Sequence, residues 1–362
     1  MSALPPIRLG LPDVGAEENA AVAAVLASGH LTMGPKVGEF ECEIAGAVGV
    51  PYAVAVANGT AALHLAAMAL RLGPGDEVIV PAYTFPATAN AVALTGATPV
   101  LVDVDPVTMN IDIDAAYRAV TPRTKAVLAV HLFGNPVDWE ALAAAVPPEV
   151  QLLEDAAGAL GATWRGMPCG GLGVMGCFSF HPRKTVTTGE GGAVTTHSEE
   201  LDAELRRLRH HGIDMRGPDI PRPSTNYRLS DIQCAIGIPQ MQRLPELLAG
   251  RRRVCEGYSA RLAALEAEGR VVVPRAAEGD THGWQAYVIQ LENRDEALHT
   301  LRAEGIEVQI GTYAVNLLSA YRDQGSRPGA ELAARRALAL PLHTQLTDAE
   351  LDRVVEGIAR FA

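Results

Sequence analysis

The feature that most constrains the fold is an alternation of short apolar runs with helical patterns through the first two thirds of the chain. Such runs are typical of buried strands, and they lie at 53–57, 77–80, 99–102, 125–130, 150–153, 175–180 and 193–195. Strands that alternate with helices form a largely parallel sheet covered on both faces. We therefore predict a large α/β domain over residues 1–244, with its ligand site at the carboxyl ends of the strands.

The last third of the chain has a different pattern. A long helical stretch is expected over 230–268, with bends at Pro239 and Pro245. Apolar alternation and helical periodicity predict three strands and one further helix, at 271–273, 284–291, 306–310 and 295–304. We therefore predict a smaller α+β domain over residues 245–362.

Composition excludes several classes of protein. The formal net charge of −12 disfavours nucleic acid as a partner, because an acidic chain repels a phosphate backbone. No apolar run is long enough to span a bilayer, and residues 1–15 lack the apolar core of a signal peptide. The five cysteines are scattered and form no CxxC pair, so we expect neither a disulfide framework nor a metal site. A reduced, cytoplasmic setting fits these features best.

One lysine stands in a loop directly after the apolar run 175–180. The loop contains Lys184 and reads SFHPRKTVTTGEGG (179–192), so that hydroxyl groups and glycines surround the amine. A lysine that forms a Schiff base needs this setting, since it must be held rigidly near a flat ring with backbone that can approach closely. A solvated lysine in a surface turn is the alternative, and for Lys184 taken alone it is the commoner one.

Asp155 ends the run 150–154. A carboxylate there can pair with the ring nitrogen of pyridoxal phosphate (PLP), which works as an electron sink only while that nitrogen stays protonated. A helix cap or a strand-end hydrogen bond is an equally common use of such an aspartate. Glu154 is expected to face the opposite side of the sheet, because strand side chains alternate.

Two further segments follow strands. Asn58-Gly59-Thr60 leads into a helix, where free amides, the helix dipole and the Thr60 hydroxyl can bind a phosphate, although most such turns bind nothing. Phe85 follows the strand 77–80 and can stack on a flat ring. A core aromatic is the commoner explanation for such a residue.

Five segments, in this order and spacing, resemble the DegT/DnrJ/EryC1/StrS family of sugar aminotransferases. They are NGTAAL (58–63), PAYTFPATANAV (81–92), LEDAAGALGA (153–162), SFHPRKTVTTGEGG (179–192) and NYRLSDIQCAIG (226–237). No single segment is decisive, but the five together are highly specific. The resemblance runs from about Ile7 to the C-terminal helix. It implies a PLP enzyme of fold type I, with a large α/β/α domain, a small C-terminal domain and a homodimer with shared active sites.

The resemblance also implies roles for single residues. Lys184 corresponds to the catalytic lysine that carries PLP as a Schiff base, and Asp155 to the partner of the pyridine nitrogen. Phe85 matches the aromatic residue that stacks on the ring. The phosphate-binding positions correspond to Thr60, Ala61 and Ser179, beside the turn at Gly59, together with Asn226 supplied by the other subunit.

One position departs from the family pattern. Three residues after the aspartate, many members carry a Gln or His that can contact the phenolic oxygen of the cofactor, whereas this chain has Gly158. The contact would then be left to water or to the substrate. Two other features are interpreted as structural. His210-His211 is expected to be a structural pair or part of the pocket wall and not a metal-binding pair. Arg251-Arg252-Arg253 is expected to form the solvated face of a long helix.

The reaction implied by the resemblance moves an amino group from an amino acid, L-glutamate by family habit, to a keto group of a nucleotide-linked deoxysugar. A keto-cyclitol or another non-nucleotide ketone stays open as the acceptor. The sugar dehydratases of the family replace the lysine with histidine, so Lys184 argues against that chemistry. A non-catalytic regulator with the same fold is the least favoured alternative, because the set of cofactor residues is complete.

Overall fold

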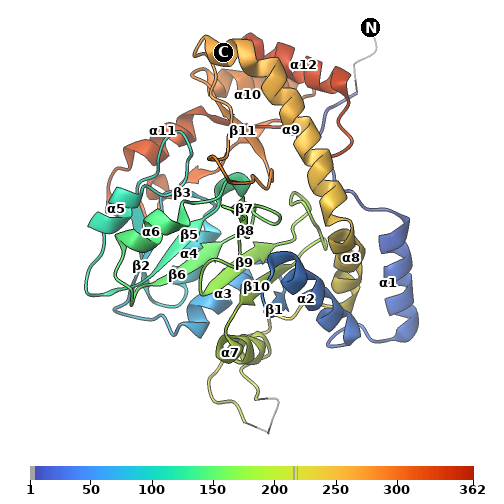
Figure 1. The fold of residues 1–362 in the computed structure, drawn as a ribbon, viewed down its shortest axis with the longest axis vertical. Coiled ribbons are helices and arrows are strands. Elements are labelled where there is room, and N and C mark those ends of the chain that lie inside the picture. The colour runs from blue at the N-terminus through green and yellow to red at the C-terminus, as the bar shows by residue number, and fades with distance from the viewer. Residues whose placement is uncertain (1–4, 215–216, 218) are drawn as a thin grey trace.

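Helices cover both faces of one large sheet in the computed structural model, which describes residues 5–214, 217 and 219–362 (Figure 1). The sheet has seven strands in the order β1-β10-β9-β6-β5-β2-β4. Their bounds are β1 (Tyr52–Val56), β2 (Glu77–Pro81), β4 (Thr98–Val102), β5 (Thr124–Val130), β6 (Gln151–Asp155), β9 (Met175–Ser179) and β10 (Gly192–Thr196). All neighbouring strands are parallel except at β10, which runs antiparallel to both β1 and β9. The predicted α/β class with a largely parallel sheet is confirmed.

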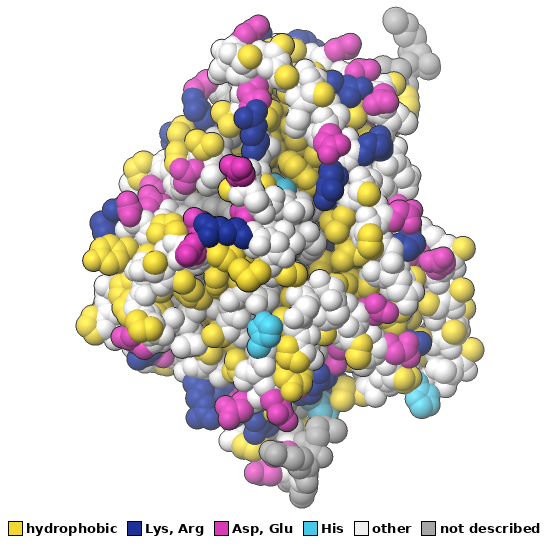
Figure 2. Space-filling model, viewed as in Figure 1, with side chains coloured by type: hydrophobic (Ala, Val, Ile, Leu, Met, Phe, Trp, Pro, Cys, Tyr) yellow, Lys and Arg dark blue, Asp and Glu magenta, His cyan; other side chains and the backbone are white. Residues whose placement is uncertain are grey.

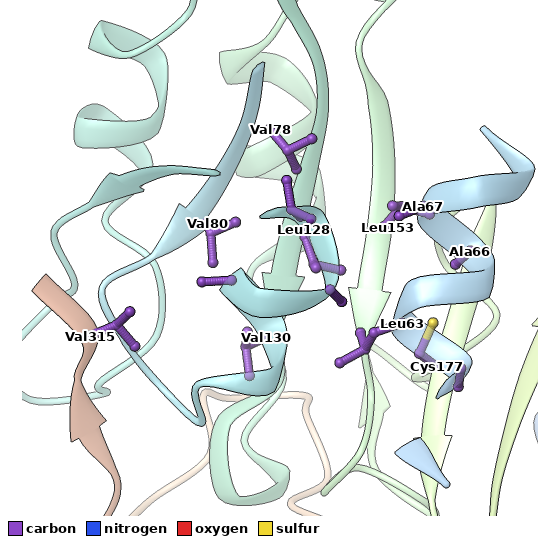
Figure 3. Close-up of a cluster of buried hydrophobic side chains, with 14 of the residues drawn as sticks. Leu63, Ala66, Ala67, Val78, Val80, Leu128, Val130, Leu153, Cys177 and Val315 are labelled. Atoms are coloured by element: carbon purple, nitrogen blue, oxygen red, sulfur yellow. The ribbon is translucent and has the colours of Figure 1, made fainter. Parts of the chain in front are cut away.

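The two faces of the sheet pack against different helices. Alternate residues of β1 enter separate clusters, Val54 and Val56 in one and Ala53 and Ala55 in the other, because side chains of a strand point to opposite faces. The first face packs against α3 (Gly59–Ala69), α4 (Ala87–Ala93) and α7 (Glu199–Arg209). Figure 3 shows α3 lying over Leu153 and Cys177 of that face. The second face packs against α2 (Pro35–Val48), α5 (Ile113–Arg118), α6 (Trp139–Ala145) and α8 (Asp231–Gln242).

A second, three-stranded antiparallel sheet lies in the C-terminal part. Its order is β11 (Tyr287–Gln290), β14 (Ala337–Leu340), β12 (Gln309–Ile310). It shares an apolar cluster with α9 (Leu244–Ala267), α10 (Arg294–Ala303) and α12 (Asp348–Ala359). Ile7 is buried in the same cluster and bridges to Ile306, so the start of the chain packs with its C-terminal part. The boundary between residues 244 and 245 stays a prediction.

The remaining elements are short or peripheral. The N-terminal helix α1 (Ala16–Ser28) packs with α2 against α8, and the long α9 continues upward from α8 (Figure 1). The others are β3 (Tyr83–Thr84), η1 (Leu132–Gly134), β7 (Thr163–Trp164), β8 (Met167–Pro168), β13 (Tyr313–Ala314), η2 (Val315–Leu317), η3 (Arg322–Gln324) and α11 (Pro328–Arg336).

Several sequence-based boundaries in the C-terminal third are wrong. The helical stretch expected over 230–268, with bends at Pro239 and Pro245, is helical but consists of two helices, α8 and α9, which meet at Arg243. Pro239 lies inside α8, and Pro245 occupies the first turn of α9, where proline is tolerated. The strand expected at 284–291 shrinks to β11, since Trp284 has a φ of 48° that no strand residue adopts. The strand at 271–273 is a single bridge from Val272 to Gln290.

The surface combines charges of both signs. Figure 2 shows acidic and basic side chains interspersed over one face of the molecule. Within the described ranges, the helices are too short or too polar to cross a membrane.

Candidate active site

Lys184 lies in the loop that joins β9 to β10, and it borders two hollows that also share Thr185. One of these hollows is lined by Lys184 and Thr185 together with Ala157, Gly158, Leu160, Ser179, Val186 and Gln285. The loop is held internally: the Lys184 amide donates to the His181 carbonyl at 2.8 Å, and the Thr187 hydroxyl donates to the Phe180 carbonyl at 3.0 Å. A lysine in such a fixed, recessed loop is not the solvated turn residue that was the alternative.

The surroundings of Lys184 favour its neutral amine. Burial lowers the pKa of Lys184 to about 8, because it penalises the ammonium form, while the negative charge of Asp155 opposes the shift. The positive charges of Arg183 and Arg251 lower the pKa further. An amine with a pKa near 8 can act as a nucleophile or as a base close to neutral pH.

Asp155 is buried at the carboxyl end of β6 and is held by neutral donors. Its carboxylate accepts hydrogen bonds from the Thr88 hydroxyl at 2.8 Å and from the Ala157 amide at 3.2 Å. Burial raises the pKa of Asp155, and these two donors together with the charge on Lys184 oppose that rise. Across the ranges that the structure describes, no salt bridge to Asp155 is formed. A buried carboxylate without a cationic contact can receive a protonated ring nitrogen.

Glu154, the preceding residue, has separate partners. Its carboxylate accepts from the amides of Leu172 at 2.8 Å and Gly173 at 2.7 Å, and it contacts the His131 ring at 3.0 Å. Glu154 therefore fixes a turn of the backbone, while Asp155 faces the side of Lys184.

The first turn of α3 closely approaches the end of β9. Asn58 caps the helix by accepting from the Ala61 amide at 2.8 Å. A Cβ added to Gly59 would lie 2.8 Å from the Ser179 Cβ, so only glycine allows this approach. The first amides of a helix have no intrahelical partner, and here they stand beside the hydroxyl groups of Thr60 and Ser179. The four positions expected to bind phosphate from this chain therefore lie in one place, with the Ala61 amide used by the cap.

Phe85 is exposed, with 59% of its surface accessible. It follows β3 and makes an edge-on contact with Tyr313, at 6.3 Å between ring centroids. The alternative of a core aromatic is therefore wrong, and the ring is free to pack against a ligand.

Asn226 and Arg228 are not among the residues that line the hollows bordered by Lys184. Their segment runs along the edge strand β1, where the Ala57 amide donates to the Tyr227 carbonyl at 2.8 Å. Asn226 is exposed, and the guanidinium of Arg228 contacts Nδ1 of His210. A supply of Asn226 to a second subunit stays a prediction. The contact with a cation is consistent with a structural reading of His210.

Two residues of the site were not identified from the sequence. Thr88 carried no signal beyond its place in the segment 81–92, yet it holds Asp155. Arg251 was expected on a solvated face, and that reading is wrong: its side chain is buried, and it donates to the Trp284 carbonyl at 2.7 Å and to the Gln285 carbonyl at 2.6 Å. Arg252 and Arg253 are exposed as expected.

Comparisons with known proteins show which family the chain resembles. The model of the DegT/DnrJ/EryC1/StrS aminotransferase family matches residues 12–359. The GDP-perosamine synthase of Caulobacter vibrioides is 40% identical over 368 residues, covering 99% of each chain. The PLP form of a putative sugar aminotransferase, Spr1654 of Streptococcus pneumoniae, superposes with a TM-score of 0.92 at 31% identity, covering 97% of each chain. DesI in the presence of its TDP-sugar product gives a TM-score of 0.91 at 35% identity, covering 98% of this chain and 92% of that one.

Proposed function

The chain belongs to the DegT/DnrJ/EryC1/StrS aminotransferase family, and from that membership we propose that it transfers an amino group to a keto group of a nucleotide-linked sugar. The similar proteins include one named for GDP-perosamine and one solved with a TDP-sugar product. The observation that carries the proposal is the meeting of Lys184, buried Asp155 and the first turn of α3, whose amides are suited to a phosphate, at one edge of the sheet.

PLP is the cofactor that these residues fit. The close approach of Gly59 to Ser179 leaves a cradle of amides and hydroxyl groups suited to a phosphate. Asp155 offers a carboxylate for the ring nitrogen, Lys184 an amine for covalent attachment, and Phe85 an exposed ring for stacking. When bound, PLP supplies an electron sink for the carbon that loses its proton.

Each residue of the site then has its own role in the proposed reaction. Nζ of Lys184 removes the proton from the donor carbon and returns a proton in the second half-reaction, a role suited to its pKa of about 8. The Asp155 carboxylate holds the proton on the ring nitrogen, and Thr88 holds that carboxylate in place. Phe85 would stack on the ring of the bound cofactor through its exposed aromatic face.

The donor, the assembly and the setting complete the proposal. We take L-glutamate as the donor, a homodimer with Asn226 reaching the partner's phosphate site as the assembly, and the cytoplasm as the compartment. The five free cysteines would stay reduced there.

Two measurements test the proposal. Borohydride treatment of PLP-loaded protein should fix the cofactor on the peptide that contains Lys184. A panel of nucleotide-linked keto sugars and keto-cyclitols, incubated with L-glutamate and analysed by mass spectrometry, should show an aminated nucleotide sugar. Trapping on another peptide, or amination of cyclitols alone, would contradict the proposal.

A further inference from the structure

Gln285 fills the space beside Gly158 in the hollow that Lys184 borders. A Cβ added to Gly158 would lie 3.4 Å from both the Cβ and the Oε1 of Gln285. Both residues line this hollow together with Lys184 and Ser179. The missing side chain after β6 therefore leaves room for a side chain from the segment before β11.

The backbone that carries Gln285 is firmly held. The Gln285 amide donates to the Phe133 carbonyl at 3.0 Å, and the Gly283 amide donates to the Gly134 carbonyl at 2.8 Å. A Cβ on Gly134 would lie 2.9 Å from the Gly158 carbonyl oxygen, so the segments carrying Gly134, Gly158 and Gln285 are in direct contact.

Buried Arg251 also holds this segment. Its guanidinium donates to the carbonyls of Trp284 at 2.7 Å and Gln285 at 2.6 Å. The Trp284 amide in turn donates to Nδ1 of His282 at 2.8 Å, at a residue whose φ is 48°. So many constraints on one turn fix the direction in which Gln285 projects.

The side-chain amide of Gln285 has spare hydrogen-bonding capacity. Its Nε2 makes one long contact, 3.4 Å from the Arg183 carbonyl, near the limit of a useful hydrogen bond. A carboxamide has two N–H donors and an accepting oxygen. A carboxamide with a spare donor, carried by a firmly held backbone and lining the same hollow as Lys184, is placed to bind a ligand.

We propose that Gln285 binds the ring hydroxyl oxygen of PLP, in the space that Gly158 leaves open, and that Arg251 is the positioning residue for Gln285. The inference rests on the proposed cofactor function. It assigns to the C-terminal part of the chain a contact that would otherwise fall to water or to the substrate.

The test replaces Gln285 with Met, which keeps length and packing but removes both donors, and in parallel with Ala. An N–H donor stabilises the ionised ring oxygen of bound PLP. Its loss should therefore raise, by about one unit, the pKa at which the visible absorption of bound PLP changes with pH. The Kd for PLP should rise roughly tenfold. Gln151→Ala is the matched control, because the Gln151 side chain bonds the Glu149 carbonyl on the surface; both values should stay at the wild-type level.

A double variant that moves the carboxamide from position 285 to position 158 distinguishes a hydrogen bond to the cofactor from an effect on packing. Gly158→Gln combined with Gln285→Ala should return the absorption pKa toward wild type, because the carboxamide is supplied from the facing position. If Gln285→Met and Gln285→Ala both titrate like wild-type protein that traps PLP on Lys184, the role of Gln285 is refuted while the proposed function stands. Failure of the wild-type protein to trap PLP would instead refute the proposed function itself.

Discussion

The hydroxyl of Thr88 donates a 2.8 Å hydrogen bond to the carboxylate of Asp155, and both side chains are buried. The Thr84 hydroxyl lies 2.9 Å from that of Thr88 and can donate to it in turn. A short relay of hydroxyl groups from β3 and α4 therefore holds the carboxylate at the end of β6. Neutral donors fix Asp155 without neutralising its charge, which leaves that charge for a ring nitrogen.

Thr88→Val should lower turnover by about tenfold, because a hydrogen bond to a charged group contributes roughly 1.5–3 kcal/mol. Losing this donor removes one influence that lowers the Asp155 pKa, so the acidic limb of the pH–rate profile should move to higher pH. Thr88→Ser, which keeps the hydroxyl, is the control. A Val variant with the wild-type pH profile would show that Thr88 does not act through Asp155.

Asp155→Asn should keep the fold and lose on the order of 100-fold or more in turnover, the scale of a lost catalytic proton contact. The amide conserves size but cannot hold a protonated ring nitrogen. The half-reaction with L-glutamate is the measurement, and circular dichroism checks the fold. A rate near wild type would remove Asp155 from the site.

The rate at which the apo-protein takes up PLP should depend on pH through Lys184. Only the neutral amine attacks the cofactor, so below its pKa of about 8 the rate should fall roughly tenfold per pH unit. The negative charge of Asp155 raises the Lys184 pKa, so Asp155→Asn should shift this profile to lower pH. Stopped-flow absorbance measures both profiles, and a midpoint near that of a free lysine would contradict the assignment.

Arg251→Met should destabilise the protein by a few kcal/mol, since it leaves the buried carbonyls of Trp284 and Gln285 without donors. It should also raise the Lys184 pKa, because the charge of Arg251 lowers it. Arg252→Met, at the exposed neighbouring position, should change stability by no more than about 0.5 kcal/mol. Equal denaturation midpoints for the two variants would contradict a structural role for Arg251.

Subunit mixing should restore activity if Asn226 and Arg228 act in the partner's site. Lys184→Ala and the double variant Asn226→Ala, Arg228→Ala should each be inactive. In a mixed dimer, one pocket combines an intact Lys184 with an intact Asn226 and Arg228, so co-refolding should recover about half the wild-type activity per heterodimer. Heterodimers that are isolated by two affinity tags yet stay inactive would place these residues in their own chain's site or outside it.

Local pattern was enough to predict the elements that position the site. Strand ends place Asp155, Ser179 and the turn at Gly59 at one edge of a parallel sheet, and the structure shows them there. The information is local because an apolar run, a capping residue and a glycine act over one or two turns of chain. The predicted boundaries failed where the chain changes direction without a local signal, at Arg243 between α8 and α9 and at Trp284 with its positive φ.

The sequence by itself determined the fold class, because apolar runs and helical patterns depend on neighbours within a few residues. It predicted the roles of Lys184 and Asp155 only through five segments taken together, since each residue alone also fits a structural role. Only the tertiary structure decided that Thr88 holds Asp155, that Arg251 is buried, and that Gln285 fills the space beside Gly158. Each of these relationships is a contact between segments far apart in the chain. A hydrophobicity pattern is local, so it does not predict which distant side chain will fill a given cavity. They arise when the C-terminal part packs on the sheet and buried donors must find acceptors.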